Sequence, residues 1–84
     1  MTDKEIVRIV AVAVQGFEET EADLKTIRKI SPGSNIWKAE CAMGEMDMEF
    51  TLYVFPDVSP ETLADMTRER LRLNLPRWQT TQTA

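Results

Sequence analysis

The sequence contains no histidine and a single cysteine, Cys41, and these two scarcities exclude several kinds of chemistry. Without histidine, the chain lacks the side chain that most often acts as a general base near neutral pH. One cysteine cannot form an internal disulfide or a paired-cysteine metal site, and its use fits a reducing compartment. We therefore expect a cytoplasmic protein that is not an enzyme and has no cofactor.

Long hydrophobic runs and excess positive charge are also missing. The longest apolar run, residues 9–14, is too short to span a bilayer. The charged N-terminal residues do not resemble a secretory signal. A net charge of −4 disfavours attraction to nucleic acid or to an anionic membrane. The sequence thus predicts no membrane association and no direct nucleic-acid binding, and it favours a protein partner.

What is present is the composition of one small folded domain. The 84 residues are 43% hydrophobic and 29% charged, which argues against disorder. A chain of this length supports one hydrophobic core. We expect a single domain over residues 1–84, with its core in residues 5–75 and an edge strand or frayed tail in residues 76–84.

Two alternating segments, residues 35–43 and 45–55, flank Gly44 and predict a β-hairpin. With Gly44 and Glu45 as the central turn residues, every facing pair on one side of the hairpin is apolar. A shift of one residue in register would destroy this segregation. The apolar pairs are Met43–Met46, Cys41–Met48, Ala39–Phe50 and Trp37–Leu52, and the other face carries Lys38, Glu40, Asp47, Glu49, Thr51 and Tyr53.

The remaining segments predict one further strand and two helices. Residues 5–15 are rich in Ile and Val on both alternating faces, which is typical of a buried strand. Thr20 resembles a helix cap, and the apolar stripe of Leu24, Ile27 and Ile30 continues as a helix that ends at residues 31–33. Residues 59–61, Ser-Pro-Glu, begin a second helix.

This order of elements predicts an α+β fold with an antiparallel sheet. The expected architecture is a ferredoxin-like sandwich, β-α-β-β-α with a possible short final strand, in which two helices cover one face of the sheet. The other face is then open, and its apolar residues form an exposed patch that a protein partner or a second copy of the chain would cover. The predicted partner-binding residues are Arg8, Val10, Glu40, Asp47, Glu49, Thr51, Tyr53 and Phe55.

Acidic residues gather on this face and in the segment after the first predicted strand. The second group forms an acidic rim of Glu18, Glu19, Glu21 and Asp23. Two interpretations stay open: a solvated charged surface, or a recognition strip for a basic partner that imitates nucleic-acid phosphates. A calcium site is disfavoured because no loop has the required spacing of oxygen ligands.

Sulfur atoms gather in the predicted hairpin, where Cys41, Met43, Met46 and Met48 share one face. Thiolate and thioether groups are ligands of soft metals such as Cu(I). The same residues also suit a hydrophobic core, in which methionine fills irregular gaps. We favour the core interpretation and predict no metal site.

The layout resembles that of ACT domains over most of residues 5–73. Gly16 follows the first predicted strand, a helix comes next, and residues 33–36, Gly-Ser-Asn-Ile, enter the second strand. The resemblance implies a dimerising, non-catalytic regulatory module. It also implies an amino-acid-like ligand near Gln15, Gly16, Ser34 and Asn35.

Our leading hypothesis is a small non-enzymatic interaction module. Such a protein would act as a regulator or inhibitor by binding a protein partner through the open sheet face and the acidic rim. Its size and acidity also suit a phage-type inhibitor of a host nucleic-acid-processing complex. The alternative hypothesis is the ACT-like domain that binds a small-molecule effector.

Overall fold

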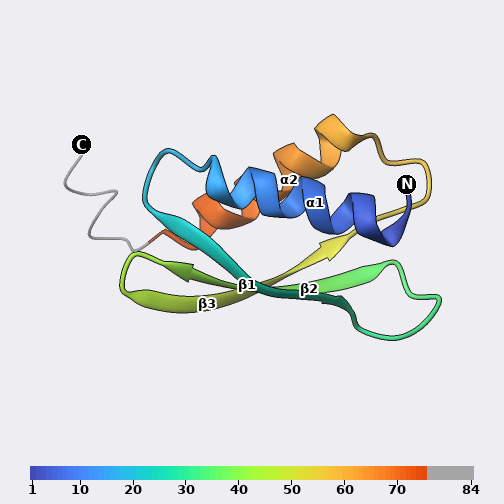
Figure 1. Cartoon of the computed structure of the whole chain (residues 1–84), viewed down its shortest axis with the longest axis horizontal. Helices are drawn as coiled ribbons and strands as arrows, with labels where there is room; N and C mark the ends of the chain where they lie inside the picture. The colour runs from blue at the N-terminus through green and yellow to red at the C-terminus, as the bar shows by residue number, and fades with distance from the viewer. Residues whose placement is uncertain (76–84) are drawn as a thin grey trace.

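The computed structural model describes residues 1–75, which form a three-stranded antiparallel sheet with two helices against one of its faces (Figure 1). The α+β class is confirmed, but the predicted order β-α-β-β-α is wrong, because the first two elements exchange their types. The predicted edge strand in residues 76–84 lies outside the described residues. The elements are α1 (Asp3–Gln15), β1 (Ala22–Lys29), β2 (Ile36–Met43), β3 (Met46–Tyr53) and α2 (Pro60–Leu73).

Helix α1 replaces the strand that we expected in residues 5–15. The Thr2 hydroxyl accepts a hydrogen bond from the Glu5 backbone N–H at 3.2 Å, and the Glu5 carboxylate accepts one from the Thr2 N–H at 3.3 Å. This reciprocal capping box starts the helix. The buried residues Ile6, Val10 and Val14 then repeat every four positions on one helix face. Periodicity alone does not separate a helix from a strand in so apolar a run, so the cap is the deciding signal.

Strand β1 replaces the predicted helix over residues 20–30, and a bulge explains the error. Leu24 lies opposite Cys41 and Ile27 lies opposite Ala39, so both side chains point to the inner face of the sheet. The register shifts between Leu24 and Thr26, where one extra residue enters the strand. Because of this extra residue, the inward-facing Leu24 and Ile27 are three positions apart instead of two. A spacing of three is typical of one face of a helix.

The hairpin of β2 and β3 has the predicted register. The pairs Met43–Met46, Cys41–Met48, Ala39–Phe50 and Trp37–Leu52 are confirmed. Gly44 has a φ of +62° and Glu45 a negative φ, which is the pattern of a type II′ turn with glycine at its first central position.

The start of helix α2 is also as predicted. The Ser59 hydroxyl accepts a hydrogen bond from the Thr62 backbone N–H at 3.1 Å, and Pro60 occupies the first helical position. Thr67 is fully buried, and its hydroxyl donates to the Leu63 carbonyl at 2.9 Å. This bond satisfies a polar group that would otherwise be costly in the core.

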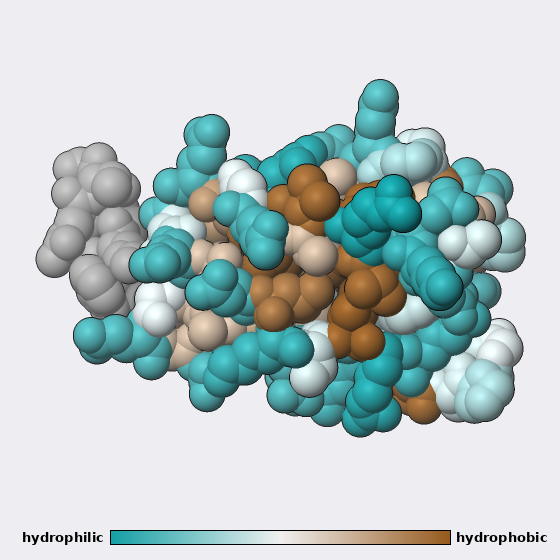
Figure 2. Space-filling model, viewed as in Figure 1, coloured by the Kyte–Doolittle hydropathy of each residue, from teal (hydrophilic) through white to brown (hydrophobic). Residues whose placement is uncertain are grey.

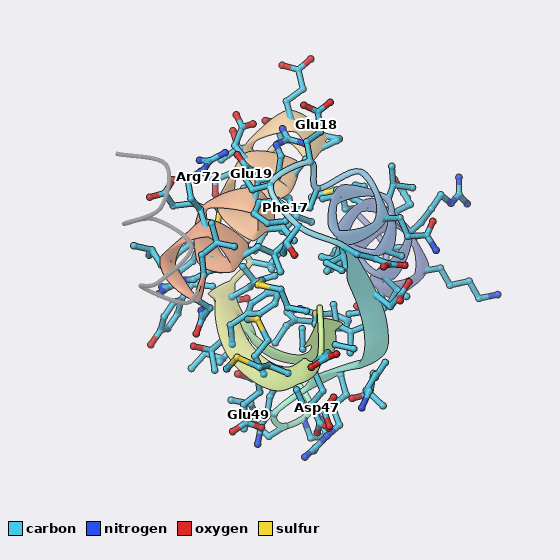
Figure 3. All side chains as sticks on the ribbon, turned by 90° about the vertical axis from the view of Figure 1, so that its left-hand side faces the viewer. Phe17, Glu18, Glu19, Asp47, Glu49 and Arg72 are labelled. Carbon is cyan, nitrogen blue, oxygen red and sulfur yellow. The ribbon has the colours of Figure 1, made fainter. Side chains whose placement is uncertain are left out.

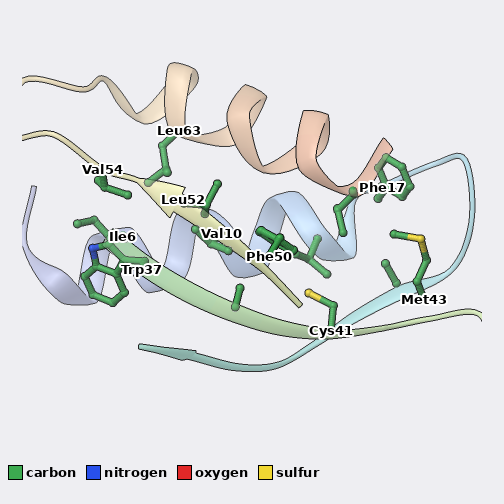
Figure 4. Packing of buried hydrophobic residues seen from close by; sticks show 14 residues of the cluster. Ile6, Val10, Phe17, Trp37, Cys41, Met43, Phe50, Leu52, Val54 and Leu63 are labelled. Atoms are coloured by element: carbon green, nitrogen blue, oxygen red, sulfur yellow. The ribbon is translucent and has the colours of Figure 1, made fainter. Parts of the chain in front are cut away.

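The core lies between the helices and the inner face of the sheet (Figure 4). Val10 and Val14 from α1 and Leu63 and Leu71 from α2 have no exposed surface. The sheet contributes Trp37, Ala39, Cys41, Met43, Phe50 and Leu52. Within residues 1–75 neither helix covers the opposite, outer face of the sheet (Figure 1).

Candidate protein-binding surface

The outer face of the sheet carries charges that are mostly paired with one another. Lys25, the bulge residue of β1, reaches across β2 to Asp47 in β3 at 2.6 Å. Lys38 contacts Glu49 at 3.2 Å and so offsets the like-charge pair that Glu49 forms with Glu40 across the hairpin. These ion pairs are exposed, so each contributes about 0–1 kcal/mol to stability. The face is therefore of mixed charge rather than acidic.

An apolar row crosses all three strands at one end of this face. Ile30 lies opposite Ile36, since the Ile30 N–H donates to the Ile36 carbonyl, and Ile36 lies opposite Tyr53. Ile30 is 50% exposed, Tyr53 is 48% exposed, and Phe55, two residues further on, is 54% exposed. We call Ile30, Ile36, Tyr53 and Phe55 the apolar row.

The predicted acidic rim does not join the acids of the outer face. Figure 3 shows Glu18 and Glu19 on the helix side of the molecule and Asp47 and Glu49 on the far side of the sheet. Glu19 binds Arg72 of α2 at 3.3 Å and so ties the segment after α1 to the end of α2. Of the rim, Asp23 belongs to the outer face, because it lies opposite Ala42, whereas Glu21 precedes β1. The acids form two groups separated by the sheet.

Two predicted partner-binding residues do not lie on the outer face. Val10 has no exposed surface and belongs to the core, so its predicted placement on an open sheet is wrong. Arg8 is exposed, but it lies on α1, which covers the inner face. Both errors follow from the exchange of strand for helix. The outer face does bring together Glu40, Asp47, Glu49, Thr51 and Tyr53, with Phe55 beyond the end of β3.

Sequence reasoning missed Ile30 and Ile36 as members of this surface. Ile30 was assigned to a helix. Ile36, however, follows directly from the predicted hairpin register, because one more pair beyond Trp37–Leu52 places it opposite Tyr53. The hairpin register, extended by this one pair, therefore predicts Ile36 on the outer face.

The residues implied by the resemblance to ACT domains lie at opposite ends of the sheet. Gln15 and Gly16 end α1 near the β2–β3 turn, where the Gly44 N–H donates to the Glu21 carbonyl at 2.8 Å. Ser34 and Asn35 lie in the β1–β2 connection, and Asn35 accepts from the Val54 N–H at the other end. A cavity of about 150 Å³ contains Ser34 and Asn35 in its lining, together with Lys29 and Phe55, but neither Gln15 nor Gly16.

Cys41 is fully buried in the hairpin face that packs on the helices. Burial raises the pKa of the Cys41 thiol to about 11, which keeps it protonated and weakly nucleophilic at neutral pH. Within residues 1–75, no three His, Cys, Asp or Glu side chains are arranged to hold a metal ion.

Hydrophobic side chains also gather on the side of the molecule that Figure 2 presents, over α1 and β1. Val7, Ile9, Leu24 and Ile27 from these elements are partly buried and pack against the core. This strip is the seam between the helix layer and the sheet. The apolar row differs from it in that three of its four side chains are about half exposed.

The fold and surface define a small two-layer α+β domain with one uncovered sheet face among its described residues. None of the helices described in residues 1–75 is both long and apolar enough to cross a membrane. Comparison of the chain with protein-family models, curated proteins and solved structures finds no significant match.

Proposed function

We propose that this protein is a non-enzymatic interaction module that binds a protein partner through the outer face of its sheet. The observation that carries the proposal is the apolar row, in which Ile30, Ile36 and Tyr53 lie on the sheet face that α1 and α2 leave uncovered, and Phe55 follows just beyond the end of β3. Its role is that of a regulator or inhibitor, which acts by occupying a surface of its partner.

The composition of the face supports a protein as the ligand. Aromatic side chains are enriched at protein interfaces, where one or two of them carry much of the binding energy. Tyr53 and Phe55 provide such anchors, and Lys38, which pairs with Glu49 and lies opposite Thr51, contributes a polar margin next to Tyr53. An apolar centre with a polar rim is the usual anatomy of an interface.

The ion pairs on the outer face also support one mode of recognition over another. A surface that imitates nucleic-acid phosphates needs unneutralised acids in rows, whereas Asp47 and Glu49 each have a lysine partner. This pairing favours apolar contact with a protein over imitation of phosphates. Inhibition of a nucleic-acid-processing complex remains compatible with the proposal, through contact with one of its protein subunits.

The test combines affinity capture from the native host with a matched pair of variants. The double variant Ile30→Ser with Phe55→Ser removes apolar surface from the row, and Val12→Ser removes it from α1, where Val12 is 63% exposed. A captured protein is identified by mass spectrometry, purified, and titrated calorimetrically against all three proteins. We expect the double variant to lose at least about tenfold in affinity, while Val12→Ser binds like the parent chain.

Two outcomes would contradict the proposal. Equal affinity of the double variant and the parent chain would remove the apolar row from the interface. Loss of binding in Val12→Ser alone would move the interface to the helix side. Circular dichroism and thermal melts of each variant separate these outcomes from a loss of folding.

A further inference from the structure

The two edges of the sheet differ in how they are protected from further strand pairing. Strand β1 contains a bulge at Lys25 and also carries Arg28 and Lys29. Bulges and lysines are the devices by which natural proteins blunt an edge. Strand β3 has eight residues without proline, lysine or arginine, and it pairs with β2 in an unbroken register. Within residues 1–75 β1 and β3 each have a neighbouring strand on one side only, and β3 is the edge that lacks a bulge and lysine.

The hairpin register determines which backbone groups point out of this edge. In a hairpin with a two-residue turn, the closing pair Met43–Met46 exchanges hydrogen bonds, and bonded and non-bonded pairs then alternate. The even-numbered residues of β3 therefore bond to β2, and the Val54 N–H continues the series by donating to Asn35. The backbone N–H and C=O groups of the odd-numbered residues point outward, and these residues are Asp47, Glu49, Thr51 and Tyr53.

A groove of about 520 Å³ lies between this edge and helix α2. Leu73 is 67% exposed beside it, and the partly buried Met66 lines it as well. Added strands gain affinity from main-chain hydrogen bonds and specificity from pockets for alternate side chains. The groove provides such a pocket on the helix side of the open edge, and its full lining is Leu52, Tyr53, Thr62, Asp65, Met66, Glu69, Arg70 and Leu73.

We propose that β3 pairs antiparallel with β3 of a second copy of this chain, with Phe50 on the two-fold axis. In this register Glu49 lies opposite Thr51 of the second copy, and Asp47 lies opposite Tyr53. All four outward-pointing residues then form hydrogen-bonded pairs, and no acid faces an acid. In the register that places Glu49 on the axis, Glu49 would lie opposite Glu49 of the second copy, and the two acids would repel each other. The register that places Thr51 on the axis sets Asp47 opposite Phe55, which lies beyond the end of the strand.

The dimer has a consequence for the whole surface. A two-fold axis perpendicular to the sheet keeps all helices on one side and joins two three-stranded sheets into one. The outer faces of the two copies then form one continuous surface. This inference rests on the edge and the groove, and it stands or falls independently of the proposed protein partner.

Substitutions at Thr51 test the register through charge. Thr51→Lys places a cation opposite Glu49 of the second copy, and Thr51→Glu places an anion there. Each cross-strand pair occurs twice in the dimer, so we expect the dissociation constant to fall roughly 2- to 30-fold for Thr51→Lys and to rise by a similar factor for Thr51→Glu. Sedimentation equilibrium of the full chain over a micromolar series measures both, against a monomer mass of 9.6 kDa.

The folding of the monomer gives an internal control, because Thr51 lies opposite Lys38 within its own hairpin. There, Thr51→Glu gains an attractive neighbour and Thr51→Lys a repulsive one, so the effects on folding and on association have opposite signs. Thr26→Glu makes the same change on the outer face of β1 and is expected to leave association unchanged.

Cysteine cross-linking tests the same register by geometry. A mixture of the single variants Glu49→Cys and Thr51→Cys is expected to form a disulfide-linked heterodimer under mild oxidation, because the Cα atoms of facing residues in such a pair lie within disulfide range. Glu49→Cys alone is not expected to cross-link, because in this register it faces Thr51 of the second copy. Cys41 is buried and does not compete.

Three outcomes would overturn the proposal. They are sedimentation of the full chain as a monomer throughout the concentration series, weaker association of Thr51→Lys, and cross-linking of Glu49→Cys to itself.

Discussion

At the scale of single residues, Cys41 shows how the environment decides the chemistry of a side chain. The sulfur-rich stretch of residues 39–50 contains potential ligands for a soft metal, yet the hairpin register directs Cys41 and Met43 into the core. Buried thiols in apolar surroundings lose their nucleophilic thiolate form because the charged form is poorly solvated.

We therefore predict that iodoacetamide at pH 8 modifies Cys41 far more slowly in the folded chain than in urea. The folded thiol has a pKa of about 11, against an ordinary value of 9.0, so little thiolate exists at pH 8. Because the unfolded thiol ionises at the lower pH, its contribution to stability is also lost as pH rises above 9. Mass spectrometry of timed samples measures the modification. Equally rapid labelling with and without urea would contradict the burial of the thiol.

At the scale of elements, local signals predicted some parts of the fold and not others. The hairpin and α2 were predictable because Gly44, the alternating pairs and the Ser59–Pro60 start all depend on neighbouring residues. The first two elements were not, because α1 is apolar at both helical and strand spacings and β1 carries a bulge. The residues of the candidate surface divide in the same way into those that local signals predict and those that they do not. The outward residues of β3 were predictable, while Val10 and Ile30 were misplaced.

The two valines Val10 and Val12 test the helical assignment directly. In a strand they would share one face, whereas in α1 they lie on different faces and are 0% and 63% exposed. We expect Val10→Ala to lower the free energy of unfolding by roughly 1.5–3 kcal/mol, because it removes buried apolar surface. Val12→Ala should change it by less than about 0.5 kcal/mol. Urea denaturation measures both, and equal effects would contradict the helix.

The capping box of α1 gives a prediction with a defined pH dependence. Thr2→Ala removes the hydroxyl that accepts from the Glu5 N–H and should destabilise the chain by about 0.5–2 kcal/mol at pH 7. Hydrogen bonds from the backbone N–H and then the hydroxyl of Thr2 lower the pKa of Glu5 below its ordinary value of 4.5. The stabilisation linked to this carboxylate is therefore present above pH 4.5 and is lost as pH falls through the lowered pKa.

Urea denaturation at pH 7 and pH 3 follows both parts of this prediction. The difference between Thr2→Ala and the parent chain should shrink at the lower pH, because protonation of Glu5 removes the carboxylate that accepts hydrogen bonds from Thr2. Lys4→Ala is the control, because it changes the same turn and keeps both hydrogen bonds of the box. A difference that stays constant between the two pH values would show that the Glu5 carboxylate does not contribute to the cap.

At the scale of the whole molecule, the two proposals give the exposed sheet two separate routes of association. The outer face presents side chains, while the edge of β3 presents backbone groups, and the two are perpendicular to each other. Ile30, which follows β1, contributes a side chain to the outer face and takes no part in the β3 edge. Thr51 contributes its backbone N–H and C=O groups to that edge. Under both proposals together, the protein would bind its partner as a monomer or present two copies of the same face as a dimer, which would raise affinity for a partner with repeated sites.

Tyr53 is the residue at which the two routes meet, because its ring lies in the apolar row and its backbone points out of the open edge. We predict that Tyr53→Lys changes the two kinds of association in opposite directions. Loss of the ring should weaken partner binding, while the new ammonium group lies opposite Asp47 of the second copy and should tighten the dimer. Sedimentation equilibrium measures the dimer, and calorimetry with the captured partner measures the face. If both associations weakened together, the edge and the face would be one interface, since a single buried surface would lose contacts in both assays.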